Sequence, residues 1–137
     1  MKGDVWLAQS DEDRYLKKLR PVVVIQDERS DVFESIVVVL GTTFEDCKSP
    51  VRVKIEPSSE NGLQRTSWIM VDKISSIHKS HLQYCLGRLS DTDIRRIDLA
   101  VLALLGICRE TAFDEHKMTN LLPREQTDSE LDDLELS

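Results

Sequence analysis

Two runs of β-branched residues constrain the fold of this chain most. Residues 22–25 read Val-Val-Val-Ile and residues 36–39 read Ile-Val-Val-Val. β-branched side chains favour extended backbone, and apolar runs of this length suit strands. The second run lies in a nearly all-apolar segment, residues 35–43, which predicts a buried strand. Pro21, which has no N–H to donate to a neighbouring strand, belongs at the start of the first one.

Four further segments have the composition of strands. Residues 51–56 alternate apolar and charged side chains, which is typical of a strand with one wet face. Residues 3–9, 66–77 and 82–89 are the other three. Clusters of polar and turn-forming residues separate the segments. The pattern predicts a small barrel of short, strongly bent strands.

One helix is predicted near the end of these segments. Ser90 can cap its start, and Asp93 follows three residues later, as in a capping box. Ile94, Ile97 and Val101 then recur at helical spacing and form an apolar stripe. The fold class that we expect is therefore mainly β with a C-terminal helix.

The acidic charge is concentrated at the C-terminal end. The chain has 137 residues and a net charge of −7. Residues 109–137 hold 3 basic and 9 acidic side chains, which leaves residues 1–108 with a net charge of −1. We expect one barrel domain over residues 1–108, followed by an acidic polar tail over 109–137. The nearly neutral domain is compatible with a nucleic-acid partner, although the whole chain is acidic.

Composition also argues against several classes of protein. The first residues carry charge instead of the apolar core of a secretory signal, and no apolar run reaches the roughly 20 residues of a membrane span. We therefore expect a cytoplasmic protein. The three cysteines and three histidines lie at spacings typical of neither a zinc site nor a disulfide framework. We expect no metal and no cofactor.

Five motifs occur in an order that resembles the MazF/PemK family of toxins. The resemblance covers residues 1–107. The motifs are Gly3-Asp4-Val5-Trp6, Arg20-Pro21-Val22-Val23-Val24, Leu40-Gly41-Thr42-Thr43, Ser67-Trp68-Ile69-Met70-Val71-Asp72, and Leu86-Gly87-Arg88-Leu89-Ser90 leading into the helix. The fold that the resemblance implies is a small SH3-like or CcdB-like barrel, in agreement with the strand pattern.

The resemblance implies a toxin endoribonuclease of a toxin–antitoxin system. Such an enzyme cleaves single-stranded RNA at a short sequence without metal. The RNA 2′-hydroxyl attacks the neighbouring phosphate, which leaves a 2′,3′-cyclic phosphate and a 5′-hydroxyl. The family also implies a homodimer and a cognate antitoxin protein as partner. For the dimer contact, the apolar residues 68–71 and the last helix are candidates.

The resemblance places Arg20 at the scissile phosphate, with a threonine hydroxyl beside it. An arginine suits this role because its planar fork holds two phosphate oxygens and stays charged. The family motif favours Thr42 as the catalytic threonine, whereas counting from Arg20 without gaps favours Thr43. Both remain candidates.

Several residues are candidates for RNA binding. Arg14, Lys17 and Lys18 in the first loop could hold phosphates. Ser67 and Asp72 begin and end the fourth motif of the resemblance, residues 67–72, and Lys73 directly follows it. The resemblance makes all three candidates for RNA contact. Two departures from the family pattern bear on this assignment: Lys73 stands where many members have Gln, and Leu40 stands where they have Pro.

Two other functions compete with RNA cleavage. The first is a toxin of the CcdB type, which has the same fold and poisons DNA gyrase by binding without catalysis. The second is a degenerate barrel that only binds RNA or protein. The Arg20-Pro21 and Thr42-Thr43 pairs favour the nuclease, because the gyrase poisons lack this combination.

Overall fold

A computed structural model describes residues 1–45 and 51–107. The strands are β1 (Asp4–Ala8), β2 (Arg20–Val24), β3 (Ser35–Thr42), β4 (Arg52–Ile55), β5 (Ser67–His78) and β6 (Leu82–Arg88). Two short 3-10 turns, η1 (Glu28–Ser30) and η2 (Lys79–His81), and one helix, α1 (Asp91–Leu104), complete the described part. The predicted tail over 109–137 lies outside it, so its boundary stays a prediction.

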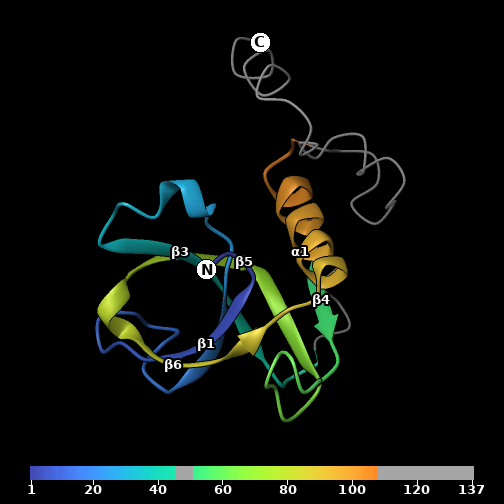
Figure 1. Cartoon of the computed structure of the whole chain (residues 1–137), viewed down its shortest axis with the longest axis horizontal. Coiled ribbons are helices and arrows are strands. Elements are labelled where there is room, and N and C mark those ends of the chain that lie inside the picture. Colours follow the sequence, from blue (N-terminus) through green and yellow to red (C-terminus); the bar gives the residue numbers. More distant parts are fainter. Residues whose placement is uncertain (46–50, 108–137) are drawn as a thin grey trace.

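The strands form one antiparallel sheet in the order β4-β5-β3-β2-β1-β6. Figure 1 shows the sheet curling into a barrel-like body, with α1 beside β4. The mainly β class with one C-terminal helix is confirmed. The sheet does not close by strand pairing, because β4 and β6 remain its two edges.

The β2–β3 pair lies at the centre of the sheet and contributes buried side chains to both faces, and the composition of β3 predicts its burial. Val22 pairs with Leu40, and Val23 pairs with Val39. Val22 and Leu40 belong to one apolar cluster, which we call the barrel cluster. Val23 and Val39 belong to a second, the helix cluster, which includes side chains of α1. Successive side chains of a strand point to opposite faces, so each strand contributes to both clusters.

A large bulge bends β5 in its middle. The adjacent β3 residues Val39 and Leu40 pair with Ile74 and Met70, so residues 71–73 of β5 lie between two consecutive pairs. A bulge of this kind bends a strand and re-aims its side chains. It lets one half of β5 pair with both β4 and β3, while the other half pairs with β3 alone.

The loop between β4 and β5 joins the two edges of the sheet. The Arg88 N–H of β6 donates to Glu60 O at 2.8 Å. A Cβ on Gly62 (φ +69°) would lie 2.1 Å from Leu86 O, and one on Gly87 would lie 2.1 Å from Glu60 O. Only glycine permits so close a backbone approach. The loop therefore brings the β4 side of the sheet against β6 (Figure 1).

Helix α1 begins as its sequence predicts. The Ser90 side chain accepts a hydrogen bond from the Asp93 N–H at 3.1 Å. Ile97 and Ala100 are buried in the helix cluster, and Gly106 with φ +75° ends the last turn. In the described part of the chain, no helix is both long enough and apolar enough to cross a membrane.

The first loop, residues 9–19, folds around one leucine. Leu16 is fully buried in the barrel cluster. Its N–H donates to Asp13 O at 3.0 Å, and its carbonyl accepts from the Ser10 N–H at 2.8 Å. Leu16 therefore holds the loop on the barrel, while Arg14, Lys17 and Lys18 remain exposed.

Replacing Leu16 by alanine should destabilise the protein strongly. Loss of a buried leucine leaves a cavity, so we expect the free energy of unfolding to fall by about 2–5 kcal/mol. Leu19→Ala is the matched control, because Leu19 lies in the same loop but is 44% exposed. Its effect should stay within about 0.5 kcal/mol. Urea denaturation of both variants measures the difference, and equal losses would contradict the anchoring role of Leu16.

Candidate functional site

Arg20 and Thr42 share one face of the sheet at neighbouring strand ends. Arg20 begins β2 and pairs with Ala8, a residue of the barrel cluster. Thr42 ends β3 and lies two residues after Leu40, which belongs to the same cluster. Because side chains two apart on a strand point the same way, both candidates are on the barrel-cluster face.

Gly41 allows β2 and β3 to approach closely at this point. A Cβ on Gly41 would lie 3.3 Å from both Pro21 Cγ and Pro21 O, which is tight packing. Pro21 in turn pairs with Leu7 of β1. The Arg-Pro and Gly-Thr-Thr motifs are thus adjacent in space, although they lie about twenty residues apart in the chain.

The Thr42 hydroxyl is oriented by its own turn. Its oxygen accepts a hydrogen bond from the Phe44 N–H at 3.1 Å. The hydroxyl proton can then be donated to a ligand. Arg20 is half-buried, and it has no hydrogen bond or ion pair with another residue in 1–45 or 51–107. A guanidinium in this situation is available to an anion.

Thr43 points to the opposite side from Thr42. It lines a cavity of about 290 Å³ together with Leu7 and Pro21. Leu7 lies between Trp6 and Ala8, and Pro21 directly follows Arg20. Because neighbouring side chains of a strand point to opposite faces, Leu7 and Pro21 face away from the barrel cluster. Ser67 at the start of β5 lines the same cavity and is buried.

The first loop contacts the β5 bulge through the Tyr15 ring, which lies close to Arg14 of the loop and to Lys73 of the bulge. Lys73 Nζ lies 4.8 Å from the centre of the Tyr15 ring, and the Arg14 guanidinium carbon lies 5.7 Å from it. Lys73 also pairs with the exposed Asp72 at 3.4 Å. Cation–π contacts of this kind hold Lys73 beside the loop. The structure thus brings Arg14, Asp72 and Lys73 together.

Tyr15 is a residue that the sequence analysis missed. It is 38% exposed and lies between two expected RNA-binding residues. An aromatic residue among basic ones was the signal that could have identified it, since exposed rings stack on unpaired bases. Lys17 and Lys18 lie in the same loop. The Gln9 side chain donates to Lys17 O at 3.1 Å, which orients that end of the loop.

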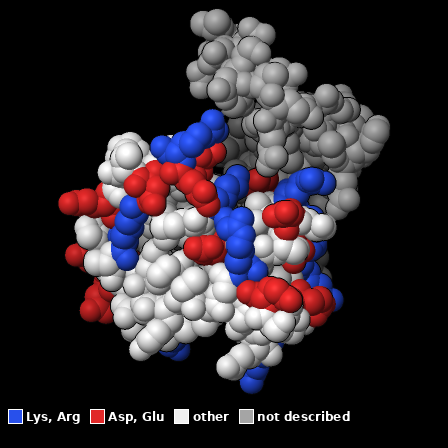
Figure 2. All heavy atoms as spheres, in the orientation of Figure 1, with Lys and Arg blue, Asp and Glu red and all other residues white. Residues whose placement is uncertain are grey.

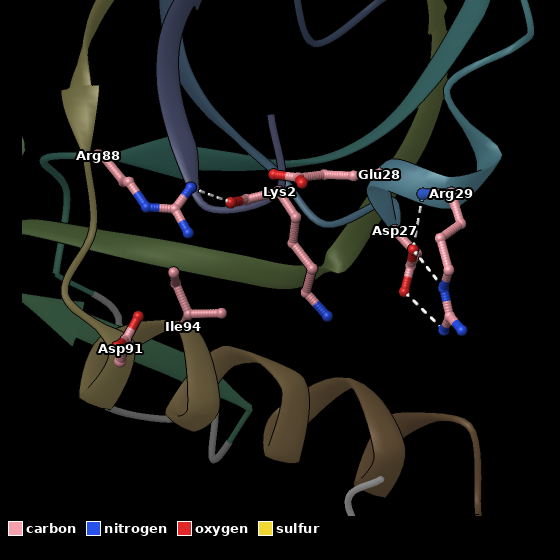
Figure 3. A pocket seen from close by; sticks show the side chains of 7 residues that line it. All are labelled: Lys2, Asp27, Glu28, Arg29, Arg88, Asp91 and Ile94. Atoms are coloured by element: carbon pink, nitrogen blue, oxygen red, sulfur yellow. Dashed lines mark hydrogen bonds and ion pairs between the residues drawn. The ribbon is translucent and has the colours of Figure 1, made fainter. Parts of the chain in front are cut away.

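A second cavity, of about 310 Å³, lies between η1 and α1. Figure 3 shows Lys2 and Ile94 pointing into it, from the N-terminal segment and from α1. Its charged lining residues are Lys2, Arg29, Arg88, Asp27, Glu28 and Asp91. Figure 2 shows the same mixture of basic and acidic side chains on this face.

Five of the six charged residues that line this second cavity form an ion pair with an opposite charge. Arg29 Nη2 lies 3.1 Å from Asp27 Oδ2, and the N-terminal amine lies 2.9 Å from Glu28. Lys2 Nζ lies 3.0 Å from Asp98, a carboxyl whose pKa burial raises above its ordinary value, partly offset by Lys2. A cavity with balanced, paired charge offers little attraction to a polyanion. The Arg20 region is the better candidate for phosphate binding.

No group of three or more His, Cys, Asp or Glu side chains within 1–45 and 51–107 is arranged to hold a metal ion. The candidate site consists mainly of arginine, lysine and hydroxyl side chains, with the Asp72 carboxylate beside Lys73.

Known proteins share both the sequence pattern and the fold. A family model described as "PemK-like, MazF-like toxin of type II toxin-antitoxin system" matches residues 1–105. The "Probable endoribonuclease MazF" of Mycolicibacterium smegmatis is 40% identical over 106 residues, which cover 77% of this chain and 96% of that protein. The "Endoribonuclease MazF" of Staphylococcus saprophyticus is 30% identical, with 77% and 91% covered.

Solved structures agree on the fold. One, described as "Endoribonuclease in complex with its cognate antitoxin from Mycobacterial species", superposes with a TM-score of 0.67 at 22% identity, covering 79% of this chain and 96% of that one. A MazE–MazF structure from Deinococcus radiodurans gives a TM-score of 0.60 at 16% identity, covering 78% and 95%. At these identities the likeness concerns the fold alone.

Proposed function

The chain belongs to the family of PemK-like, MazF-like toxins of type II toxin–antitoxin systems, and on this premise we propose that it is an endoribonuclease that cleaves single-stranded RNA without metal. The observation that carries the proposal is the shared face of Arg20 and Thr42 at adjacent strand ends. It favours cleavage over a gyrase-binding or purely RNA- or protein-binding barrel, because it supplies a cation and a hydroxyl donor to one anion.

The proposed reaction uses the nucleophile that RNA itself carries. The 2′-hydroxyl oxygen bonds to the adjacent phosphorus as its proton leaves to solvent. The bond from phosphorus to the 5′-oxygen then breaks, and that oxygen takes up a proton. The products are a 2′,3′-cyclic phosphate and a 5′-hydroxyl. The protein has to align the strand and stabilise the charge that develops on the phosphorane.

Arg20 and Thr42 divide this task. The Arg20 guanidinium stays protonated because the pKa of arginine lies above about 12, so its role is electrostatic. Thr42 donates its hydroxyl proton to a phosphorane oxygen, since its oxygen already accepts from the Phe44 N–H. Thr43, on the other face, is excluded from this role in our proposal.

The neighbouring basic residues bind the rest of the strand. Arg14, Lys17 and Lys18 present exposed charge on the first loop, which contacts Lys73 through Tyr15. Such contacts attract phosphates at any sequence and position the strand. Action on RNA also makes the cytoplasm the expected site of function.

An antitoxin and a second copy of the chain are the proposed protein partners. One solved neighbour is described as an endoribonuclease in complex with its cognate antitoxin, and another as MazE–MazF. For the homodimer, the expected contribution of residues 68–71 is wrong for three of the four, because Ile69, Met70 and Val71 are buried in the chain's own core. The other expected contact, the last helix, supports the dimer at its C-terminal end: the cap residue Leu105 is 59% exposed, and Ile107 just beyond it is 65% exposed.

Catalysis is tested with Arg20→Ala and Thr42→Val in excess EDTA. The unsubstituted protein should cut a long single-stranded RNA and leave 5′-hydroxyl ends. Arg20→Ala should lower kcat about 10²–10³-fold, because it removes the main donor to the phosphorane. Thr42→Val should lower kcat without a large change in KM. Arg95→Ala, an exposed arginine of α1, is the control. Activity that returns only with added magnesium would overturn the mechanism.

Phosphate binding is tested with Lys73→Met, which keeps the length of the side chain and removes its charge. We expect weaker binding of a 2′-O-methyl RNA, which lacks the nucleophile. The slope of log Kd against log salt should fall by about 0.7, as for one lost phosphate contact on a single strand. Lys54→Met, an exposed lysine of β4, is the matched control. Identical slopes for the two variants would remove Lys73 from the RNA path.

Dimer formation is tested by sedimentation at tens of micromolar, a range in which a typical specific dimer is assembled. We expect a dimer for the unsubstituted chain and a monomer for Leu105→Asp, because burying the new carboxylate at an apolar contact is unfavourable. Val32→Asp is the control, since Val32 is 81% exposed in a different region. A monomeric unsubstituted chain would refute the dimer.

A further inference from the structure

We propose that the 290 Å³ cavity beside Thr43 binds one unpaired nucleobase of the RNA strand and thereby sets one position of the cleaved sequence. The inference rests on the proposed function, because its ligand is a base of the same strand whose phosphate lies at Arg20. The cavity, here called the base pocket, is lined by Leu7, Pro21, Thr43, residues 62–65, Ser67 and Leu86.

The walls of the base pocket suit a flat, partly apolar group. Leu7, Pro21, Leu63 and Leu86 supply apolar surface from three strands and one loop. The volume lies at the lower end of the range for ligand pockets, about 300–1,000 Å³, so it admits a single small group. A nucleobase has apolar faces and polar edges, and this matches apolar walls with a few polar groups.

Polar groups converge on the same space. Thr43, Gln64 and Arg65 line the pocket together with Ser67, a residue that is 2% exposed. Ser67 donates its hydroxyl proton to Arg65 O at 3.1 Å, so its oxygen can accept from a ligand. Thr43 and Gln64 can both donate and accept. Thr43, Gln64 and Arg65 are exposed in the free protein. They discriminate between bases where a bound base covers them, because a wrong base then leaves them without a hydrogen-bond partner.

The loop that forms one wall is held rigidly. Asn61 is 3% exposed; its side-chain oxygen accepts from the Ser58 and Leu63 N–H groups, and its amide donates to Glu56 O at 2.9 Å. Gly62 packs directly on the backbone of Leu86. The pocket is therefore formed before any ligand arrives, which lowers the cost of binding.

The position of the pocket connects it to the proposed cleavage site. Pro21 and Thr43 line it, and each directly follows a proposed catalytic residue in the chain. The pocket and the Arg20–Thr42 face therefore lie on the two sides of the same strand ends. An unpaired strand that crosses this edge can place a phosphate on one side and a neighbouring base on the other. A duplex cannot do so, because its bases are stacked and paired.

The test measures base preference at each position around the cut. A single-stranded RNA with a randomised window is cleaved in EDTA, and the fragments with 5′-hydroxyl ends are sequenced. Thr43→Val and Gln64→Leu should both reduce the preference at the same single position, about tenfold, as expected for one lost hydrogen bond. All other positions should keep their preference. Thr66→Val is the matched control, because its hydroxyl donates to Glu56 outside the pocket.

A second measurement does not depend on cleavage. Each of the four nucleoside monophosphates is titrated in turn into the 15N-labelled full chain. At least one of them should shift the amide signals of residues 62–65 and Thr43, and Leu63→Trp, which fills the pocket, should abolish these shifts while the remaining spectrum shows a folded protein.

The outcomes separate this inference from the proposed function. Absence of RNA cleavage by the unsubstituted protein would overturn the function. Cleavage with an unchanged base preference in both pocket variants would overturn the base pocket alone. Absence of shifts at residues 62–65 with all four nucleotides would also count against the pocket, whether or not the protein cleaves RNA.

Discussion

The register between β2 and β3 is the constraint on which the rest of the structure depends. Both strands are apolar on both faces, so their pairing buries Val22 with Leu40 on one side and Val23 with Val39 on the other. A shift of one residue would exchange the faces of every following side chain. This register also decides that Arg20 shares a face with Thr42. The core packing and the chemistry of the site are thus set by the same set of backbone hydrogen bonds.

Two loops complete the site, and each is attached to the sheet by a specific contact. Leu16 is buried in the barrel cluster and holds the basic first loop, which then meets Lys73 through Tyr15. Asn61 fixes the β4–β5 loop internally, and Gly62 packs that loop on the backbone of Leu86 in β6. Functional groups that lie on loops need such attachment to a rigid body, since loops alone do not keep groups within the tolerance that binding or catalysis requires.

Much of the fold could be predicted from local patterns. The β-branched runs, the alternation over residues 51–56 and the Ser90 cap all correspond to elements of the structure. The bulge at residues 71–73 could not, because no residue there carries a bulge signal; it arises where β5 must pair with both β3 and β4. The contact of Lys73 with Tyr15 could not be predicted either, because it joins segments that are far apart in the chain.

By itself the sequence determined the strand and helix segments, the near neutrality of residues 1–108 and the motifs that contain Arg20 and the two threonines. It left the choice between Thr42 and Thr43 open, because counting along the chain gives two answers. Only the tertiary structure places Thr42 on the face of Arg20 and Thr43 in a separate cavity. The physical reason is that side-chain alternation is a local property, whereas the face that two strands share depends on hydrogen bonds between segments about twenty residues apart.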